Sequence, residues 1–246
     1  MSHYDALFAG YLMALTGWLV LARYVTALRS NREPCPFQHP WREVGWAIAA
    51  CVAVLIVGQV YQRGWLLPTG NFRPVAESLN HCIIFSPFFF LLFFRKQPLT
   101  TAWIPDNRIA LRLATGIGLA LAAITVYLIV RPDNPPIFAV LLSIIHPKNL
   151  PMAVQVLLED VAIAILLVRF RAAIGLHASV LLVACLFAAG HIPAMLTEST
   201  PWSEFAHLIL DAGIAAAAIT VLYRSADISW FWCVHYAMDM MQFQTI

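Results

Sequence analysis

Four ionisable side chains lie inside strongly apolar stretches of this sequence: Glu159, His191, His235 and Asp239. A charge at the centre of a bilayer costs about 2.5–3.5 kcal/mol on insertion scales. Polar groups that carry this cost on three separate helices are therefore expected to meet in one place. A carboxylate that converges with two imidazoles can take a proton from water and stabilise developing charge, so the pattern indicates hydrolytic chemistry.

The spacing of these residues indicates which side chains share a helix face. Phe187 precedes His191 by four positions, His235 precedes Asp239 by four, and such pairs project from one face. Glu159 is followed by Asp160, and adjacent residues of a helix diverge by about 100°. Only one carboxyl of that pair can face a given site. The other needs a hydrogen-bond partner or has to keep its proton.

Alternative interpretations stay open for each of these patterns. Each histidine, taken alone, is more typical of a hydrogen bond between helices, and the acidic pair could be structural. Two histidines and a carboxylate also form a ligand set for zinc, although the sequence contains no H-E-x-x-H motif. Asp211, four residues after His207, is a secondary candidate for which an interhelical role is equally well supported.

The composition identifies the elements that must position these residues. Hydrophobic residues make up 61% of the 246 residues, charged residues only 11%, and the mean hydropathy is +0.76. Apolar runs approach the ~20 residues that cross a bilayer as a helix. The sequence therefore predicts an all-α polytopic transmembrane bundle formed by one membrane domain, residues 1–246. A net charge of +2 gives no indication of a nucleic-acid partner.

Eight spans are predicted from the apolar runs, and a ninth run is too short to cross. The run 137–145 is bracketed by prolines and is expected to form a re-entrant or interfacial helix. The predicted spans are 6–28, 44–62, 77–94, 110–130, 150–170, 177–196, 205–223 and 228–243.

The distribution of basic residues predicts the orientation of these spans. With the N-terminus outside, the inner loops and span ends carry eleven of the 15 basic residues and the outer ones carry four, as the positive-inside rule requires. Glu159 then lies nine residues, or about 14 Å, from the outer end of its span. The other candidates fall in the same outer half of the bilayer. The inner set is Arg23, Arg29, Arg32, Arg42, Arg95, Lys96, Arg108, Arg112, Arg169, Arg171 and Arg224, and the outer set is Arg63, Arg73, Arg131 and Lys148.

The order of these motifs resembles the CPBP (CAAX protease and bacteriocin-processing, or Abi) family of intramembrane proteases. The family motifs are Glu-Glu-x-x-x-Arg, Phe-x-x-x-His and His-x-x-x-Asn or Asp. Phe187-Ala-Ala-Gly-His191 and His235-Tyr-Ala-Met-Asp239 fit the second and third, whereas Glu159-Asp160 fits the first only in part, because Ala164 stands at the arginine position. The resemblance covers a catalytic core at 150–243, and the four spans within 1–130 carry no recognised motif.

The resemblance implies a role for each matching residue. Glu159 would activate water with help from His191, while His235 and the residue four positions later would stabilise the oxyanion. An ionised Asp239 would repel an oxyanion, so it would have to be protonated or to orient His235. The missing arginine leaves Asp160 without the partner that the family provides.

The resemblance also leads to expectations about substrate and location. The expected enzyme is a glutamate-type intramembrane endopeptidase without a cofactor, with a zinc-dependent variant as the alternative. Its expected substrate is a membrane-anchored protein with an apolar C-terminal tail, processed in the outer half of a bacterial inner membrane as in myxosortase-type protein sorting. A degenerate member that acts as a scaffold, immunity or transport protein is the non-enzymatic alternative.

Overall fold

A computed structural model describes residues 3–29, 37–68, 70, 72–131, 136–197 and 200–243, and the described chain is built of helices. The prediction of an all-α helical bundle is confirmed. The α-helices are α1 (His3–Tyr24), α2 (Pro40–Gln62), α3 (Arg73–Phe94), α4 (Ile109–Val130), α5 (Ile137–Ile144), α6 (Leu150–Ile174), α7 (Leu176–Gly190), α8 (Ile192–Thr197), α9 (His207–Ser225) and α10 (Ile228–Phe243). Short 3-10 helices are η1 (Thr26–Leu28), η2 (Leu99–Ala102), η3 (Pro147–Asn149) and η4 (Trp202–Ala206).

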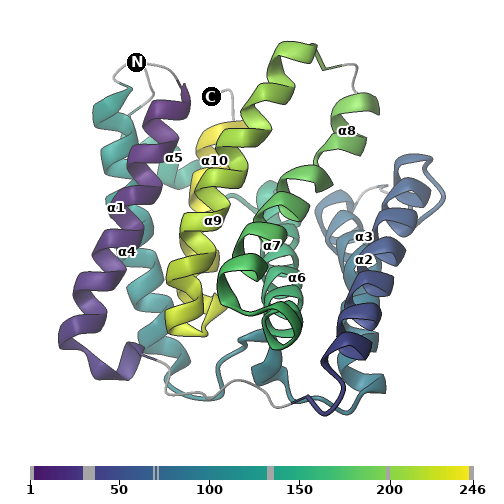
Figure 1. Ribbon diagram of the computed structural model, residues 1–246. Coiled ribbons are helices and arrows are strands. Elements are labelled where there is room, and N and C mark those ends of the chain that lie inside the picture. The colour runs from purple at the N-terminus through teal and green to yellow at the C-terminus, as the bar shows by residue number, and fades with distance from the viewer. Residues whose placement is uncertain are drawn as a thin grey trace.

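The long helices alternate in direction, so α1 begins and α10 ends at the same side of the bundle, the upper side in Figure 1. Seven segments of the described chain are long and apolar enough to cross a membrane. They correspond to α1, α2, α3, α4, α6 with its preceding turn, α7 with α8, and α9. The chain is therefore a multi-pass membrane protein.

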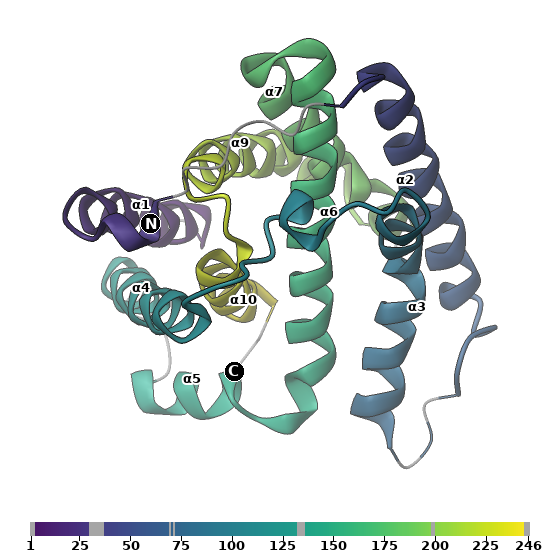
Figure 2. The same cartoon turned by 90° about the horizontal axis from the view of Figure 1, so that it is seen from below.

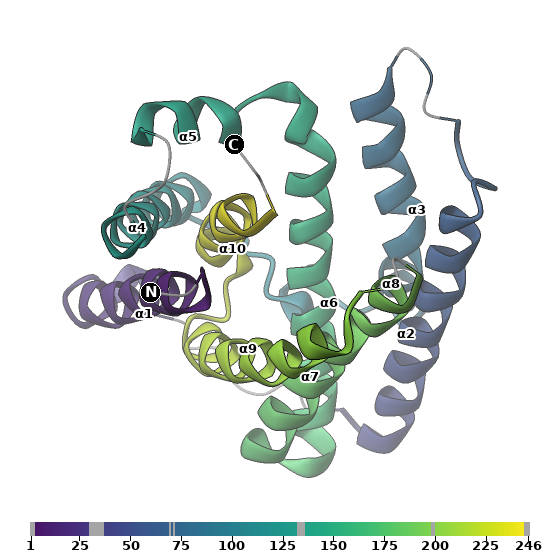
Figure 3. The ribbon, with the colours of Figure 1, turned by 90° about the horizontal axis from the view of Figure 1, so that it is seen from above.

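The eighth predicted span, α10, differs from the others in length and surroundings. It has 16 residues, which at 1.5 Å per residue is about 24 Å, less than the thickness of a hydrocarbon core. Viewed along its axis, α10 lies at the centre of the bundle among α1, α4, α6 and α9 (Figure 3). Protein rather than lipid thus surrounds much of α10, and this places its polar residues inside the molecule.

The short apolar run forms α5, which lies across the bundle axis at its rim (Figures 2 and 3). Its eight residues cover about 12 Å and cannot cross a bilayer. The Tyr236 hydroxyl of α10 donates to the Ile144 carbonyl at the end of α5, at 2.7 Å. The side-chain amide of Asn149 donates to the Ser143 carbonyl at the same distance. These bonds hold the turn that leads directly into α6.

Two glycines allow α1 and α4 to pack closely on α10. A Cβ added to Gly116 of α4 would lie 2.6 Å from the Trp230 carbonyl oxygen, and one added to Gly10 of α1 would lie 2.7 Å from Met238 Cε. Trp18 of α1 stacks on Trp230, with ring centroids 5.4 Å apart. Small residues at such crossings let helix backbones approach, as is common in membrane bundles.

Buried ion pairs tie the lower ends of the helices together. Arg112 of α4 contacts Asp227, just before α10, at 2.7 Å. Glu43 of α2 accepts hydrogen bonds from Arg95 and Gln97, which follow α3. The buried guanidinium of Arg169 in α6 donates to Gln97 in turn. Such groups can be buried in apolar surroundings only when they are paired.

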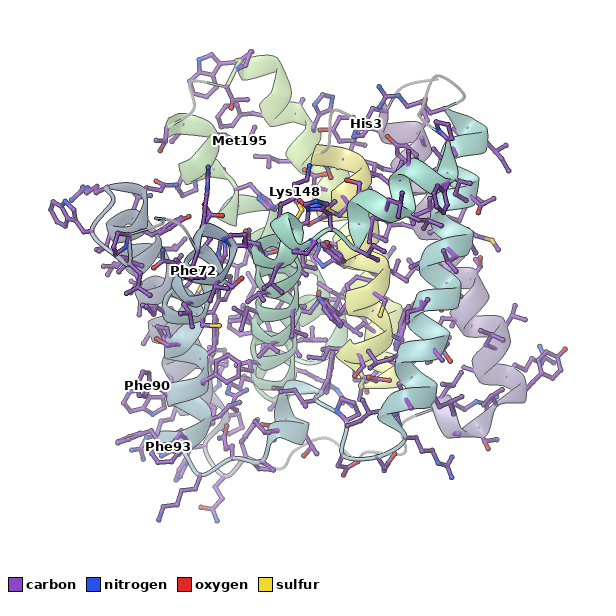
Figure 4. The ribbon with its side chains drawn as sticks, turned by 180° about the vertical axis from the view of Figure 1, so that it is seen from behind. His3, Phe72, Phe90, Phe93, Lys148 and Met195 are labelled. Atoms are coloured by element: carbon purple, nitrogen blue, oxygen red, sulfur yellow. The ribbon has the colours of Figure 1, made fainter. Side chains whose placement is uncertain are left out.

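The outer surface of the bundle is apolar. Phe90 and Phe93 of α3 are 67% and 84% exposed and point away from the other helices (Figure 4). Large apolar side chains on the outside agree with a surface that faces lipid rather than water.

Candidate active site

A cavity of about 480 Å³ lies inside the bundle between α10 and the helices α1, α6, α7 and α9. It extends from Tyr4 and Gln242 near the upper ends of α1 and α10 to Phe231, more than two turns deeper on α10. Its polar lining includes every primary candidate from the sequence. The polar lining residues are Tyr4, Tyr11, Gln155, Glu159, His191, Thr200, His207, Asp211, His235, Asp239 and Gln242.

Glu159 lies on the α6 wall of this cavity. Its Oε1 accepts a hydrogen bond of 2.9 Å from the side-chain amide of Gln155, one turn earlier on α6. Glu159, His235 and Asp239 each offer a ligand atom, and these three atoms all lie within 4.8 Å of one another. The structure therefore brings together the acidic residue of one predicted motif and both polar residues of another.

Asp160 points away from Glu159 and binds His235. Its Oδ1 lies 2.9 Å from His235 Nδ1, and its side chain is fully buried. The partner of Asp160 therefore comes from α10 and not from an arginine on α6. Ala164, at the arginine position of the motif, is fully buried. The second Asp160 oxygen, Oδ2, has no hydrogen-bond partner among the described residues.

Asp239 lies on the other side of the same imidazole. Its Oδ1 is 3.7 Å from His235 Nε2, which is within ion-pair range but longer than a hydrogen bond. His235 thus has one carboxyl at each ring nitrogen. The closer contact is the one between Nδ1 and Asp160. Asp160 is therefore better placed to orient His235 than Asp239, for which the sequence suggested that role.

His191 approaches the cavity from the end of α7. The Phe187 ring, one turn earlier, packs edge-on against His191 with centroids 5.2 Å apart, and it lies 6.0 Å from the His235 ring. Phe187 therefore packs against both imidazoles. His191 lines the cavity but is not a member of the compact group formed by Glu159, His235 and Asp239.

The upper part of the cavity contains the secondary candidate Asp211. It lies on α9 one turn below His207, whose ring stacks on Tyr4 of α1 with centroids 4.1 Å apart. This stack joins α1 to α9 where the cavity approaches the upper side. Asp211 lines the same cavity as Glu159, nearer to its upper end.

Two of the polar lining residues that were not predicted from the sequence lie close to the reacting groups. Gln155 precedes Glu159 by four positions on one helix face, and that spacing could have identified it. Tyr11 of α1 lies in the part of the chain without a motif. In the sequence, the spacing of Tyr11 from Tyr4 and Leu7 indicates only that the three share one helix face. That this face lines the site follows from the packing of α1 beside α10, which the sequence does not reveal.

The donor set would also suit a divalent cation. Glu159 and Asp239 offer carboxylate oxygens and His235 offers Nε2, while Asp160 holds Nδ1 as a carboxylate often holds a metal-bound histidine. As side chains on the wall of a cavity, the same groups could instead activate water. No protein-family model matches this chain, and it matches no curated protein and no solved structure.

Proposed function

We propose that this protein is an intramembrane endopeptidase that uses Glu159 as the base for a hydrolytic water. The observation that supports this most directly is the cluster of Glu159, His235 and Asp239 on one wall of an internal cavity, with ligand atoms within 4.8 Å of one another. A carboxylate that costs free energy to bury in a membrane protein is most often retained for function.

In the proposed reaction, Glu159 takes a proton from water while the water oxygen forms a bond to the scissile carbonyl carbon. His191, across the cavity, orients this water. The carbonyl π electrons move to oxygen and form an oxyanion, which His235 stabilises through Nε2–H. The C–N bond then breaks, and the proton held by Glu159 goes to the leaving amine.

The contact between Asp160 and His235 fits this scheme. In this scheme His235 is a doubly protonated imidazolium, which donates its Nδ1–H to Asp160 and keeps its Nε2–H directed toward Glu159, Asp239 and the cavity. A buried carboxylate that orients an imidazole in this way is a recurrent catalytic arrangement. In the proposed reaction, Glu159 is thus the base and Asp160 orients His235. The orienting role of Asp160 does not require an arginine at position 164.

The proposed substrate is a membrane-anchored protein cut near an apolar C-terminal tail. An internal cavity lined by transmembrane helices can receive a segment that already lies in the bilayer. The resemblance to CPBP proteases supports this substrate class. The basic residues at the lower ends of the helices support a site in the extracytoplasmic half of the membrane. The bacterial inner membrane and a role in protein sorting belong to the proposal through the resemblance alone.

The substitution Glu159→Gln tests the proposal. Glutamine keeps the shape and the acceptor oxygen that Gln155 binds, but it cannot take a proton from water. General-base catalysis contributes about 10²–10⁴-fold, so cleavage should fall at least about 100-fold. The readout is the set of protein C-termini in membranes of cells that express wild type or the variant, compared by mass spectrometry.

Glu77→Gln is the matched control, because Glu77 pairs with the exposed Arg73 on α3 and does not line the cavity. Wild type and Glu77→Gln should release the same C-termini. Termini that persist in Glu159→Gln would exclude Glu159 as the base. If cells that express the wild-type protein contain no new C-termini, that result would favour the scaffold, immunity or transport alternatives.

A zinc-dependent peptidase is the second candidate, favoured by Asp160 behind His235 and by the three converging donors. With Glu159 as the base, dialysis of purified protein against a chelator should leave cleavage unchanged, and elemental analysis should find no stoichiometric zinc. Loss of cleavage on chelation, restored by Zn²⁺, would support the metal-dependent mechanism instead.

A further inference from the structure

The hydroxyl of Tyr11 is a hydrogen-bond donor in the cavity to which the proposed reaction assigns no role. Tyr4, Leu7 and Tyr11 project from one face of α1 into the cavity. Tyr4 stacks on His207 near the upper end, whereas Tyr11 lies two turns deeper. Within the described part of the chain, the Tyr11 hydroxyl makes no hydrogen bond. A phenol in a mostly buried cavity normally has such a partner.

Tyr11 lies at the level of the reacting groups. Tyr11 is eight residues from the start of α1, and His235 is eight residues from the end of α10. Both helix ends lie at the upper side, so each residue is about 12 Å below it along its helix. Glu159 of α6 lies at the same level, because its ligand atom is within 4.8 Å of those of His235 and Asp239. The carboxyls of Asp239 and Glu159 both lie close enough to act electrostatically on the Tyr11 hydroxyl.

Gly10 holds Tyr11 beside the helix that carries the site. A Cβ at position 10 would lie 2.7 Å from Met238 Cε and 3.2 Å from the Ala123 carbonyl oxygen, so α1 is in close contact with α10 and α4 there. Met238 is the residue before Asp239. The backbone at Tyr11 is therefore set against α10 within one turn of His235 and Asp239.

The proposed reaction lacks a second donor for the oxyanion. Asp239 lies beside His235 Nε2, and a carboxylate accepts hydrogen bonds but cannot donate them. Gln155 already donates to Glu159. Thr200 and Gln242 line the cavity nearer its upper end. Tyr11 is thus the neutral hydrogen-bond donor on the cavity wall that lies at the depth of Glu159 and has no other hydrogen bond among the described residues.

We infer that the Tyr11 hydroxyl donates a hydrogen bond to the oxyanion, together with His235 Nε2–H. This inference rests on the proposed peptidase function. Tyr11 would be a catalytic residue contributed by the N-terminal helices, so residues 1–130 would take part in the chemistry. The phenol keeps its proton throughout, and the reaction balance given above is unchanged.

Tyr11→Phe tests the inference, because it removes one oxygen and leaves the ring packing intact. The substrate is a synthetic peptide that covers a junction found to depend on Glu159. Loss of one oxyanion donor lowers kcat by about 10²–10³-fold, with KM nearly unchanged. Tyr61→Phe on α2, outside the cavity, is the matched control and should retain the wild-type kcat.

A second measurement separates hydrogen bonding from a structural effect. A thioamide at the scissile bond accepts hydrogen bonds poorly, so the ratio of amide to thioamide rates should be at least tenfold smaller in Tyr11→Phe than in wild type. An unchanged kcat, a change confined to KM, or an unchanged ratio would overturn the role of Tyr11 while leaving Glu159 as the base. No cleavage by wild type would overturn both.

Discussion

At the scale of single residues, the central feature is that two adjacent carboxyls have different surroundings. Glu159 lines the cavity and accepts from Gln155, whereas Asp160 is buried behind His235. The rotation of about 100° between neighbouring helix positions makes this division unavoidable. One carboxyl can meet a substrate, and the other can only position the imidazole.

Asp160→Asn should lower kcat without unfolding the protein. Asparagine can still accept from His235 Nδ1–H, but it loses the negative charge beside the ring. The equivalent Asp→Asn change in a Ser-His-Asp triad lowers kcat by about 10⁴-fold, so a large loss of kcat is expected. Peptide cleavage by the purified variant measures the effect, with Asp106→Asn, an exposed loop position, as the control. Wild-type activity in Asp160→Asn would contradict a positioning role.

At the scale of helices, close contacts on both sides of α10 determine where the site residues stand. Gly116 brings α4 against the backbone of Trp230, and Gly10 brings α1 against Met238. Trp18 stacks on Trp230 and fills the space between α1 and α10. His235 and Asp239 belong to the same helix as Trp230, so these contacts also set their depth in the cavity.

Gly116→Ala should destabilise the bundle by about 1–3 kcal/mol, the usual cost of overpacking. The new methyl group would lie 2.6 Å from the Trp230 carbonyl oxygen, so α4 and α10 would have to separate. Gly118→Ala is the control, because a Cβ there meets nothing within 4 Å. Unfolding in mixed detergent micelles gives both free energies. Equal stability of the two variants would argue against close α4–α10 packing.

At the scale of the whole molecule, charge is distributed unevenly between the two ends of the bundle. Ten of the described basic residues lie at the lower end in Figure 1, and four lie at the upper end, where the cavity approaches the surface. Arg32 lies outside the described residues. The lower set is Arg23, Arg29, Arg42, Arg95, Lys96, Arg108, Arg112, Arg169, Arg171 and Arg224, and the upper set is Arg63, Arg73, Arg131 and Lys148.

Reporter fusions should place the two ends on opposite sides of a bacterial inner membrane. Alkaline phosphatase, which is active only outside the cytoplasm, should be active when fused after Thr200 and inactive when fused after Lys96. Thr200 lines the cavity near its upper end, so this result would also locate the site. A silent fusion at Thr200 together with an active one at Lys96 would reverse the proposed orientation.

Much of the fold follows from the apolar pattern of the sequence. Runs of about 20 apolar residues predict spanning helices because unpaired backbone groups cannot be left in lipid. Seven of the eight predicted spans each correspond to one α-helix, the span 177–196 is divided between α7 and α8, and the 137–145 run forms the short α5. The pattern cannot tell a helix surrounded by lipid from one surrounded by protein, because both are apolar all round. For that reason the central position of the short α10 was not predicted.

By itself, the sequence determined that a multi-pass helical bundle carries polar residues at similar depths, because burial cost and helix rise depend only on residue type and spacing. Only the tertiary structure decided which of these residues meet. It paired Asp160 with His235, packed Phe187 against two imidazoles and placed Tyr11 on the wall of the cavity that Glu159 lines. These contacts join residues distant in the chain, and they depend on the rotation and close approach of whole helices, which local spacing does not encode.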